Sequence, residues 1–201
     1  MATISIHNSE ITLKAREALK GKWAIAVGTS VLLIAATTII QALPIIGFLI
    51  SLVIAGALNI GYSQFVLALV NGEKAETEML FGKFDILFTG FVAYFLMALF
   101  VILWTMLLII PGIIAAFAYS MTWYILAENP EMSANDAIAK SKEMMAGNKM
   151  KLFFLMLRFI GWGILCIFTL GIGFIFLFPY AAVSCGTFYN ELKSNQSSVT
   201  V

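Results

Sequence analysis

Long uncharged stretches dominate the chain. Residues 23–72 and 86–127 contain no Asp, Glu, Lys or Arg, and residues 152–190 contain only Arg158. A transmembrane helix needs about 20 predominantly apolar residues to cross a bilayer. Each stretch is close to twice that length and is therefore interpreted as a helical hairpin.

Proline and glycine, the residues that end or turn a helix most readily, stand near the middle of each stretch. They are Pro44 and Gly47, Pro111 and Gly112, and Gly171 and Gly173. These breaks predict six spans, at about 23–43, 46–70, 86–109, 112–127, 152–169 and 173–190. A β-barrel fits poorly, because barrel strands alternate polar and apolar residues. The pattern predicts an all-α membrane protein with six transmembrane helices.

Composition agrees with this fold class. Hydrophobic residues make up 61% of the chain and charged residues 11%, against about 25% charged in an average soluble protein. The mean hydropathy is +0.97. Twelve basic and 11 acidic residues give a net charge of +1, so we expect no nucleic-acid partner. These values exclude a soluble enzyme and a disordered chain.

The basic residues lie on one side of the predicted spans. Apart from Arg158 they are Lys14, Arg16, Lys20, Lys22, Lys74, Lys83, Lys140, Lys142, Lys149, Lys151 and Lys193. Because basic loops stay in the cytoplasm, both termini and both long loops are expected there. The first residues lack the features of a cleavable signal peptide, so we expect the first span to be retained as the insertion signal.

A short motif recurs before each hairpin. Its three copies are Glu17-x-Leu19-x-Gly21-Lys22, Glu78-x-Leu80-x-Gly82-Lys83 and Glu143-x-Met145-x-Gly147. We interpret the chain as a single membrane domain, residues 1–201, with tandem repeats at about 9–70, 73–130 and 133–192 and a flexible tail at 193–201. The repeats share one orientation, and rough threefold packing is one expectation.

Each repeat is expected to begin with a short amphipathic cytoplasmic helix. In the third, Ser133 and Asp136 form a capping box, and Gly147 is placed to end the helix. Its apolar face is Ala134, Ala137, Ile138, Ser141 and Met145. These helices are interpreted as anchors along the headgroup layer. The alternative is a cytoplasmic collar that gates or recruits a partner.

Small and polar residues recur four apart in the second and fourth spans. They are Gly47, Ser51, Ala55, Asn59 and Ser63, and then Gly112, Ala116 and Ser120. Such a stripe lets helix backbones approach closely in lipid. The alternative is a polar path through the membrane, with Asn59 as its deepest side chain and Ser63 and Ser120 beside it.

Arg158 is the one charge inside a predicted span. It lies seven residues after Lys151, about 10 Å along a helix. At that depth a long side chain can reach back to the headgroups. Alternatively, Arg158 pairs with Asp85 or Glu78, or holds an anionic lipid or substrate.

The sequence offers little catalytic chemistry. Cys166 and Cys185 are interpreted as reduced packing residues, and His7 has no cluster of ligands beside it. No metal-ligand spacing, phosphate loop or dinucleotide motif is present. We expect no metal, no cofactor and no enzymatic activity.

An ordered series of motifs resembles the bacterial integral membrane family called DUF975. The motifs are Ala18-Leu19-Lys20-Gly21-Lys22-Trp23, Leu107-Leu108-Ile109-Ile110-Pro111-Gly112-Ile113, Tyr119-Ser120-Met121, Leu126-Ala127-Glu128-Asn129-Pro130, Ser141-Lys142-Glu143-Met144-Met145-x-Gly147, Phe159-Ile160-Gly161-Trp162, Thr169-Leu170-Gly171-Ile172-Gly173, Pro179-Tyr180 and Phe188-Tyr189. The resemblance implies a multi-span protein of the bacterial cytoplasmic (inner) membrane. It implies no activity, because the family has no established function.

Two functions remain open. The first is a non-enzymatic membrane scaffold that associates with itself or with a membrane-protein partner, and with membrane lipids. The alternative is a small transporter or channel component for a small molecule, lipid or peptide, which would need polar side chains converging at mid-depth.

Overall fold

The fold consists of helices and the turns between them. The structure is a computed structural model that describes residues 4, 6–41 and 44–199. Over these residues it contains no strand. The helices are α1 (Asn8–Leu19), α2 (Trp23–Gln41), α3 (Pro44–Val70), η1 (Thr77–Leu80), η2 (Phe84–Ile86), α4 (Leu87–Leu107), α5 (Ile109–Tyr119), α6 (Thr122–Glu128), α7 (Ala134–Met144), α8 (Lys149–Phe168) and α9 (Ile172–Val199).

These helices follow the predicted spans closely. The first predicted break falls between α2 and α3, and residues 42–43 lie outside the described residues. The second turn occurs earlier than expected, at the extended Leu108, so Pro111 stands in the first turn of α5, where a missing N–H does no harm. The third turn is at Leu170 and Gly171, both with positive φ. The fourth predicted span is two helices, because the chain breaks at Ser120 and Met121.

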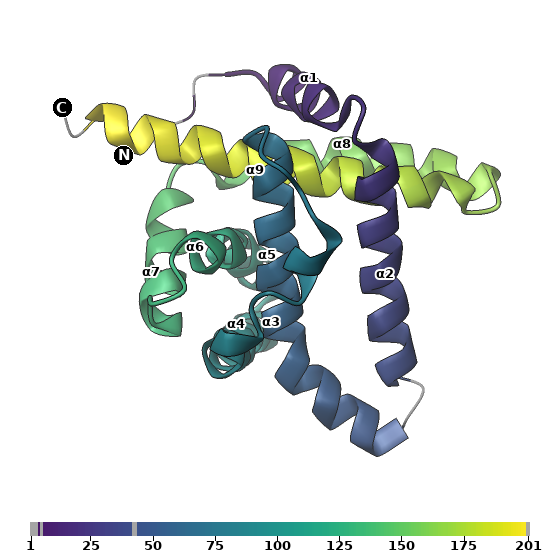
Figure 1. Cartoon of the computed structure of the whole chain (residues 1–201). Helices are drawn as coiled ribbons and strands as arrows, with labels where there is room; N and C mark the ends of the chain where they lie inside the picture. The colour runs from purple at the N-terminus through teal and green to yellow at the C-terminus, as the bar shows by residue number, and fades with distance from the viewer. Residues whose placement is uncertain (1–3, 5, 42–43, 200–201) are drawn as a thin grey trace.

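The three hairpins diverge from one another. In Figure 1 the α2–α3 hairpin runs down the view, the α8–α9 hairpin runs across it, and α4 and α5 are seen nearly along their axes. α1 meets α2 at 98° across a short break. Of the described helices, five are long and apolar enough to cross a membrane, or up to six if α1 and α2 count as one bent span.

The hairpins meet in a core built from the C-terminal half of α3, from α6, and from the C-terminal half of α9. Fully buried side chains in these three segments include Phe65, Leu69, Ile125, Leu126 and Phe188. By contrast, the ends of the hairpins that lie away from this core are exposed. Leu170 at the α8–α9 turn is 95% exposed and Met106 near the α4–α5 turn is 81% exposed.

An α-helix forms at two of the three copies of the repeated motif. α1 and α7 form, and Gly21 and Gly147 after them have φ of +77° and +83°. The middle copy forms only the 3-10 turns η1 and η2, and Gly82 does not have a positive φ. The three copies of the motif therefore do not form equivalent helices, and the prediction of an amphipathic helix at the middle copy is wrong. Leu80 of η1 instead packs against α3, where a Cβ on Gly61 would lie 2.3 Å from the Leu80 carbonyl oxygen.

The apolar faces of α1 and α7 are buried in the protein. On α1 the side chains of Ile11, Ala15 and Leu19 have no exposed surface. On α7 the buried face is Ala134, Ala137, Ile138, Ser141 and Met144, nearly as predicted. Helices whose apolar faces pack on other helices do not present those faces to lipid. At the other end of the chain, residues 193–199 of the predicted flexible tail are helical, because α9 continues to Val199; residues 200–201 lie outside the described residues.

Candidate functional site

Arg158 lies against α1. Its Nη1 donates to Oγ1 of Thr12 at 3.2 Å. The hydroxyl of Tyr180 on α9 donates to the carbonyl oxygen of the same Thr12 at 3.1 Å. One residue of α1 therefore joins α8 and α9, and the guanidinium of Arg158 is held by a neutral hydroxyl.

A pocket of about 410 Å³ opens beside this contact. Its lining is Thr12, Leu13, Arg16, Trp23, Arg158, Phe159, Trp162, Cys166, Gly173, Phe176, Leu177 and Tyr180. Arg16 follows Thr12 by four residues, so it lies on the same face of α1, one turn further along. Two guanidinium groups thus border a pocket whose lining contains no Asp or Glu.

Aromatic rings form one wall of the pocket. The centroid of Trp23 lies 6.2 Å from that of Phe176 and 6.4 Å from that of Tyr180. Phe159 meets Tyr180 edge to face at 5.4 Å. These separations are typical of favourable ring pairs, so the wall is a packed surface. A neighbouring, almost entirely apolar cavity of about 310 Å³ shares Phe159 and Leu177 with the pocket.

Residues 1–111 and 105–196 match a family described as a protein of unknown function, DUF975. The chain belongs to the DUF975 family. No curated protein and no solved structure matches this member. The resemblance carried by its sequence motifs is therefore confirmed. The two matched segments together extend from α1 into the C-terminal end of α9, so they include every element of the pocket.

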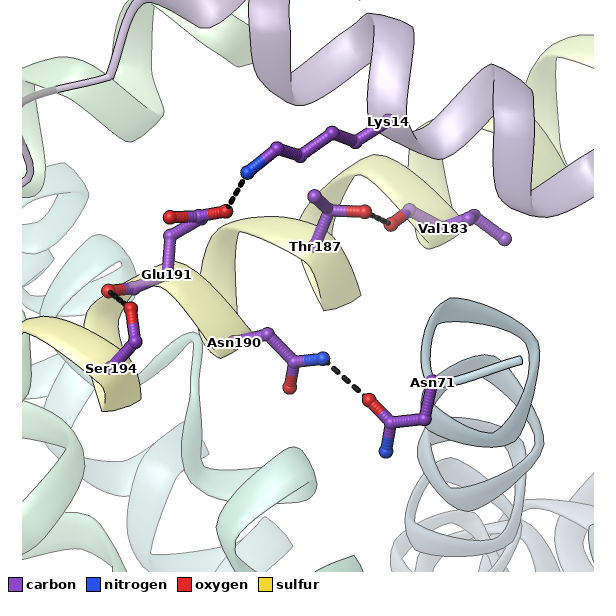
Figure 2. A network of polar contacts seen from close by, with 7 residues as sticks. All are labelled: Lys14, Asn71, Val183, Thr187, Asn190, Glu191 and Ser194. Atoms are coloured by element: carbon purple, nitrogen blue, oxygen red, sulfur yellow. Dashed lines mark hydrogen bonds and ion pairs between the residues drawn. The ribbon is translucent and has the colours of Figure 1, made fainter. Parts of the chain in front are cut away.

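A second group of polar contacts joins α1 and α3 to the C-terminal half of α9 in this family member. Figure 2 shows Lys14 of α1 pointing toward Glu191 of α9, with their charged atoms 2.5 Å apart. Beside it, Nδ2 of Asn190 donates to Oδ1 of Asn71 at 2.7 Å. An open pocket of about 620 Å³ next to this group carries both signs of charge, from Lys14, Lys20, Lys22, Glu17 and Glu191. Mixed charge suits a solvated surface.

Hydrogen bonds also join the segment that leads into α1 to the start of α8. The Ile4 N–H donates to Oδ1 of Asn148, and Nζ of Lys151 donates to the Ile4 carbonyl oxygen. Nδ2 of Asn8 donates to the Lys151 carbonyl oxygen. The start of α1 is thus bound to the start of α8, although the two are far apart in sequence.

The polar side chains expected to line a path do not converge on a pocket. Asn59 donates to the Ala55 carbonyl oxygen and Ser120 donates to the Phe117 carbonyl oxygen, each within or next to its own helix. Ser63 is buried in the core, and Asp85 is exposed on η2. None of these four residues lines any of the three pockets above. Arg158 donates a hydrogen bond to Thr12. Among the described residues it forms no ion pair with Asp85 or with Glu78.

The small-residue stripes are partly in contact. Gly47 is buried and Ser51 and Ala55 are half-buried on α3. Gly112 is buried against Thr105, while Ala116, one turn later on α5, is exposed. A close contact between helix backbones instead involves Gly56, which the four-residue spacing passes over. It meets Gly90 of α4.

The charged residues of the repeated motif lie outside the core. Glu17, Glu78 and Glu143 are exposed, and Lys83 is half-exposed. Lys22, just before α2, donates to the Glu73 carbonyl oxygen at 3.1 Å, which joins the start of α2 to the loop that follows α3. In that loop, a hydrogen bond to the carboxylate of Glu76 raises the pKa of Lys74. Over the described residues, no three His, Cys, Asp or Glu side chains come together as metal ligands.

Sequence reasoning missed most of the pocket. Thr12, Arg16, Trp23 and Tyr180 attract no attention as site residues on their own. Periodicity places Thr12 and Arg16 on one face of α1, but it does not reveal that α8 and α9 lie beneath that face. The one signal available was Arg158, an isolated charge within an apolar helix.

Proposed function

We propose that the protein is a non-enzymatic, multi-pass protein of the bacterial cytoplasmic membrane that acts as a scaffold. Its hairpins enter the bilayer, and α1 and α7 present a rigid charged surface to a membrane-protein partner or a second copy on the cytoplasmic side. The observation that carries this proposal is the way in which α1 and α7 are fixed to the hairpins by buried faces and by hydrogen bonds distant in sequence.

Membrane insertion is supported by the hairpin ends. The residues that flank the α4–α5 and α8–α9 turns, including Met106, Ile110, Phe168 and Ile172, are large, apolar and exposed. An apolar surface of this extent is typical of contact with lipid or a partner. Because the hairpins diverge, they would enter the bilayer at different tilts, with the charged loops at the opposite end.

The scaffold role is supported by polar groups that join one helix to another. Ser141 of α7 donates to the Ala118 carbonyl oxygen and accepts from the Met121 N–H. Tyr124 donates to the Ala182 carbonyl oxygen, and Tyr189 and Lys193 both donate to Glu128. These groups hold helices in place, whereas a transport path would need polar groups directed into a passage.

Topology is tested by cysteine labelling in intact cells, in a C166S/C185S background. We expect L170C, at the α8–α9 turn, to react with a membrane-impermeant maleimide from outside. E131C, in the exposed loop before α7, should react only after lysis. Labelling of E131C in intact cells, or no labelling of L170C under either condition, would contradict the proposed insertion.

The scaffold role is tested by a photo-crosslinking residue at position 142 on the exposed face of α7, with position 108 at a hairpin turn as the matched control. We expect a discrete protein adduct from position 142, of a mass that fits one partner or a second copy, and lipid adducts only from position 108. Absence of any protein adduct from position 142 would contradict a scaffold. Solute flux through reconstituted vesicles would favour the transporter.

A further inference from the structure

We propose that the pocket between α1, α8 and α9 binds one anionic phospholipid of the surrounding bilayer. Arg16 and Arg158 would hold the phosphate, and the aromatic wall and the adjoining apolar cavity would hold an acyl chain. This inference rests on the proposed insertion in a membrane, and the experiment below separates the two.

The two arginines of the pocket favour an anionic ligand. Over the described chain neither Arg16 nor Arg158 makes an ion pair, and the ion pairs that do form involve Lys14, Lys74 and Lys193. The nearby carboxylate Glu17 lines the other, open pocket, and Glu191 is paired with Lys14. Both arginine side chains are exposed in the described structure. In the proposed membrane setting, a guanidinium exposed to lipid is costly without a counter-charge. Thr12 supplies Arg158 with a hydrogen bond but with no charge.

The type of group fits a phosphate. A guanidinium presents several N–H donors in one plane, which suits the paired oxygens of a phosphate better than a single ammonium does. Arg16 and Arg158 come from two helices that are fixed to each other through Thr12. Both residues line the same pocket, so in this proposal one anion at its mouth is shared by the two side chains.

The shape of the site favours a lipid over a free anion. Most of the lining below the two arginines is apolar, and the 310 Å³ cavity between α2 and α9 adjoins it, with Phe159 and Leu177 lining both. Trp162 and Phe176 on the outer wall are each 53% exposed, so the pocket opens on the side that would face the bilayer. A free phosphate would use the arginines and leave this apolar surface empty.

The experiment measures quenching of tryptophan fluorescence by brominated acyl chains. The protein is reconstituted in phosphatidylcholine vesicles that contain equal mole fractions of brominated phosphatidylglycerol or brominated phosphatidylcholine. A W104F/W123F background keeps Trp23 and Trp162, which line the pocket. A W23F/W123F/W162F background keeps only Trp104, which is exposed on α4 away from it.

We expect brominated phosphatidylglycerol to quench the pocket tryptophans with an apparent preference of about tenfold over phosphatidylcholine, the effect of one good charge-assisted contact. Trp104 should be quenched equally by both lipids. R16Q/R158Q should abolish the preference. R16Q alone, which breaks no hydrogen bond of the described structure, should reduce it while leaving the fold intact. The matched control K140Q/K142Q removes two charges from α7 and should retain the preference.

Each other result is informative. Equal quenching of the pocket tryptophans by both lipids, or a preference that survives R16Q/R158Q, overturns the lipid site and leaves membrane insertion standing. Loss of the preference in K140Q/K142Q shows general surface charge and overturns the site. Removal of the preference by excess inorganic phosphate shows a soluble anion site in place of a lipid site. Absence of quenching of Trp104 by either lipid overturns insertion itself.

Discussion

Gly56 of α3 and Gly90 of α4 meet backbone to backbone. A Cβ on Gly56 would lie 2.0 Å from the carbonyl oxygen of Gly90, a separation at which one of the two helices would have to move. On the other side, a Cβ on Gly90 would lie 2.9 Å from the Ala57 nitrogen. This crossing joins the first hairpin to the second, so it fixes how the two diverge.

The G56A substitution should therefore destabilise the protein strongly. Because the obstructing atoms are backbone atoms, the clash cannot be relieved by a change of rotamer, and we expect a loss of about 3 kcal/mol. The free energy of unfolding is measured by circular dichroism during titration of a harsh detergent into protein in mild micelles. G28A on α2 is the control, since nothing lies within 4 Å of its new methyl group. A loss as large in G28A as in G56A would contradict this explanation.

Ser141 supports the break between α5 and α6. It is fully buried, its Oγ donates to the Ala118 carbonyl oxygen at 2.9 Å, and it accepts from the Met121 N–H at 3.2 Å. S141A would leave both backbone groups buried without these bonds, at a cost of about 2 kcal/mol.

The comparison is S133A on the same helix. Ser133 caps α7 by accepting from the Asp136 N–H, and loss of a cap at an exposed helix start costs about 1 kcal/mol. Both free energies come from the same detergent titration. If S133A were the more damaging change, the α5–α6 break would not depend on Ser141.

The sequence predicted where individual helices lie, but it did not predict which helices contact one another. Uncharged runs located the hairpins because a bilayer or a core demands uninterrupted apolar residues, and the spacing of Ala134, Ala137, Ile138 and Ser141 gave the buried face of α7. The Gly56–Gly90 crossing was missed, because a four-residue stripe identifies small residues on one helix but not which one meets a partner. The prediction of a middle amphipathic helix was wrong, because motif similarity does not determine how a short segment packs.

The same distinction applies to the candidate site: one of its residues could be predicted from the sequence, and its contacts could not. Arg158 stands out in the sequence because an isolated charge in an apolar run is costly. Its contact with Thr12 joins α8 to α1, and no local sequence pattern predicts that these two helices meet. Arg16 was counted only among the basic residues that orient the chain. Its position on the pocket follows from the docking of α1, which is a property of the tertiary fold.

Glu128 links α6 to α9 and provides a third test. Its Oε2 accepts from the Tyr189 hydroxyl at 2.9 Å and from Nζ of Lys193 at 2.7 Å. Y189F removes one of these donors and should cost about 1 kcal/mol, the usual net value of a hydrogen bond, while the stacking of ring 189 on Tyr124 is kept. Y119F is the control, since Tyr119 is buried but makes no side-chain hydrogen bond among those described. Equal losses in Y189F and Y119F would show that the contact with Glu128 contributes nothing.

The three glycines of the repeated motif should respond differently to alanine. Gly21 and Gly147 have φ of +77° and +83°, a left-handed conformation that costs an alanine about 1–2 kcal/mol. Gly82 does not have a positive φ, and its nearest neighbours would lie at 3.5 Å or more from a new Cβ, which is ordinary contact. We therefore expect G21A and G147A to lower the midpoint of thermal unfolding in detergent and G82A to leave it nearly unchanged. G147N should lose less than G147A, because asparagine tolerates the left-handed region better. If G82A were as damaging as the other two, the middle copy of the motif would end in the same left-handed turn, and the three repeats would be more alike than the 3-10 turns at η1 and η2 indicate.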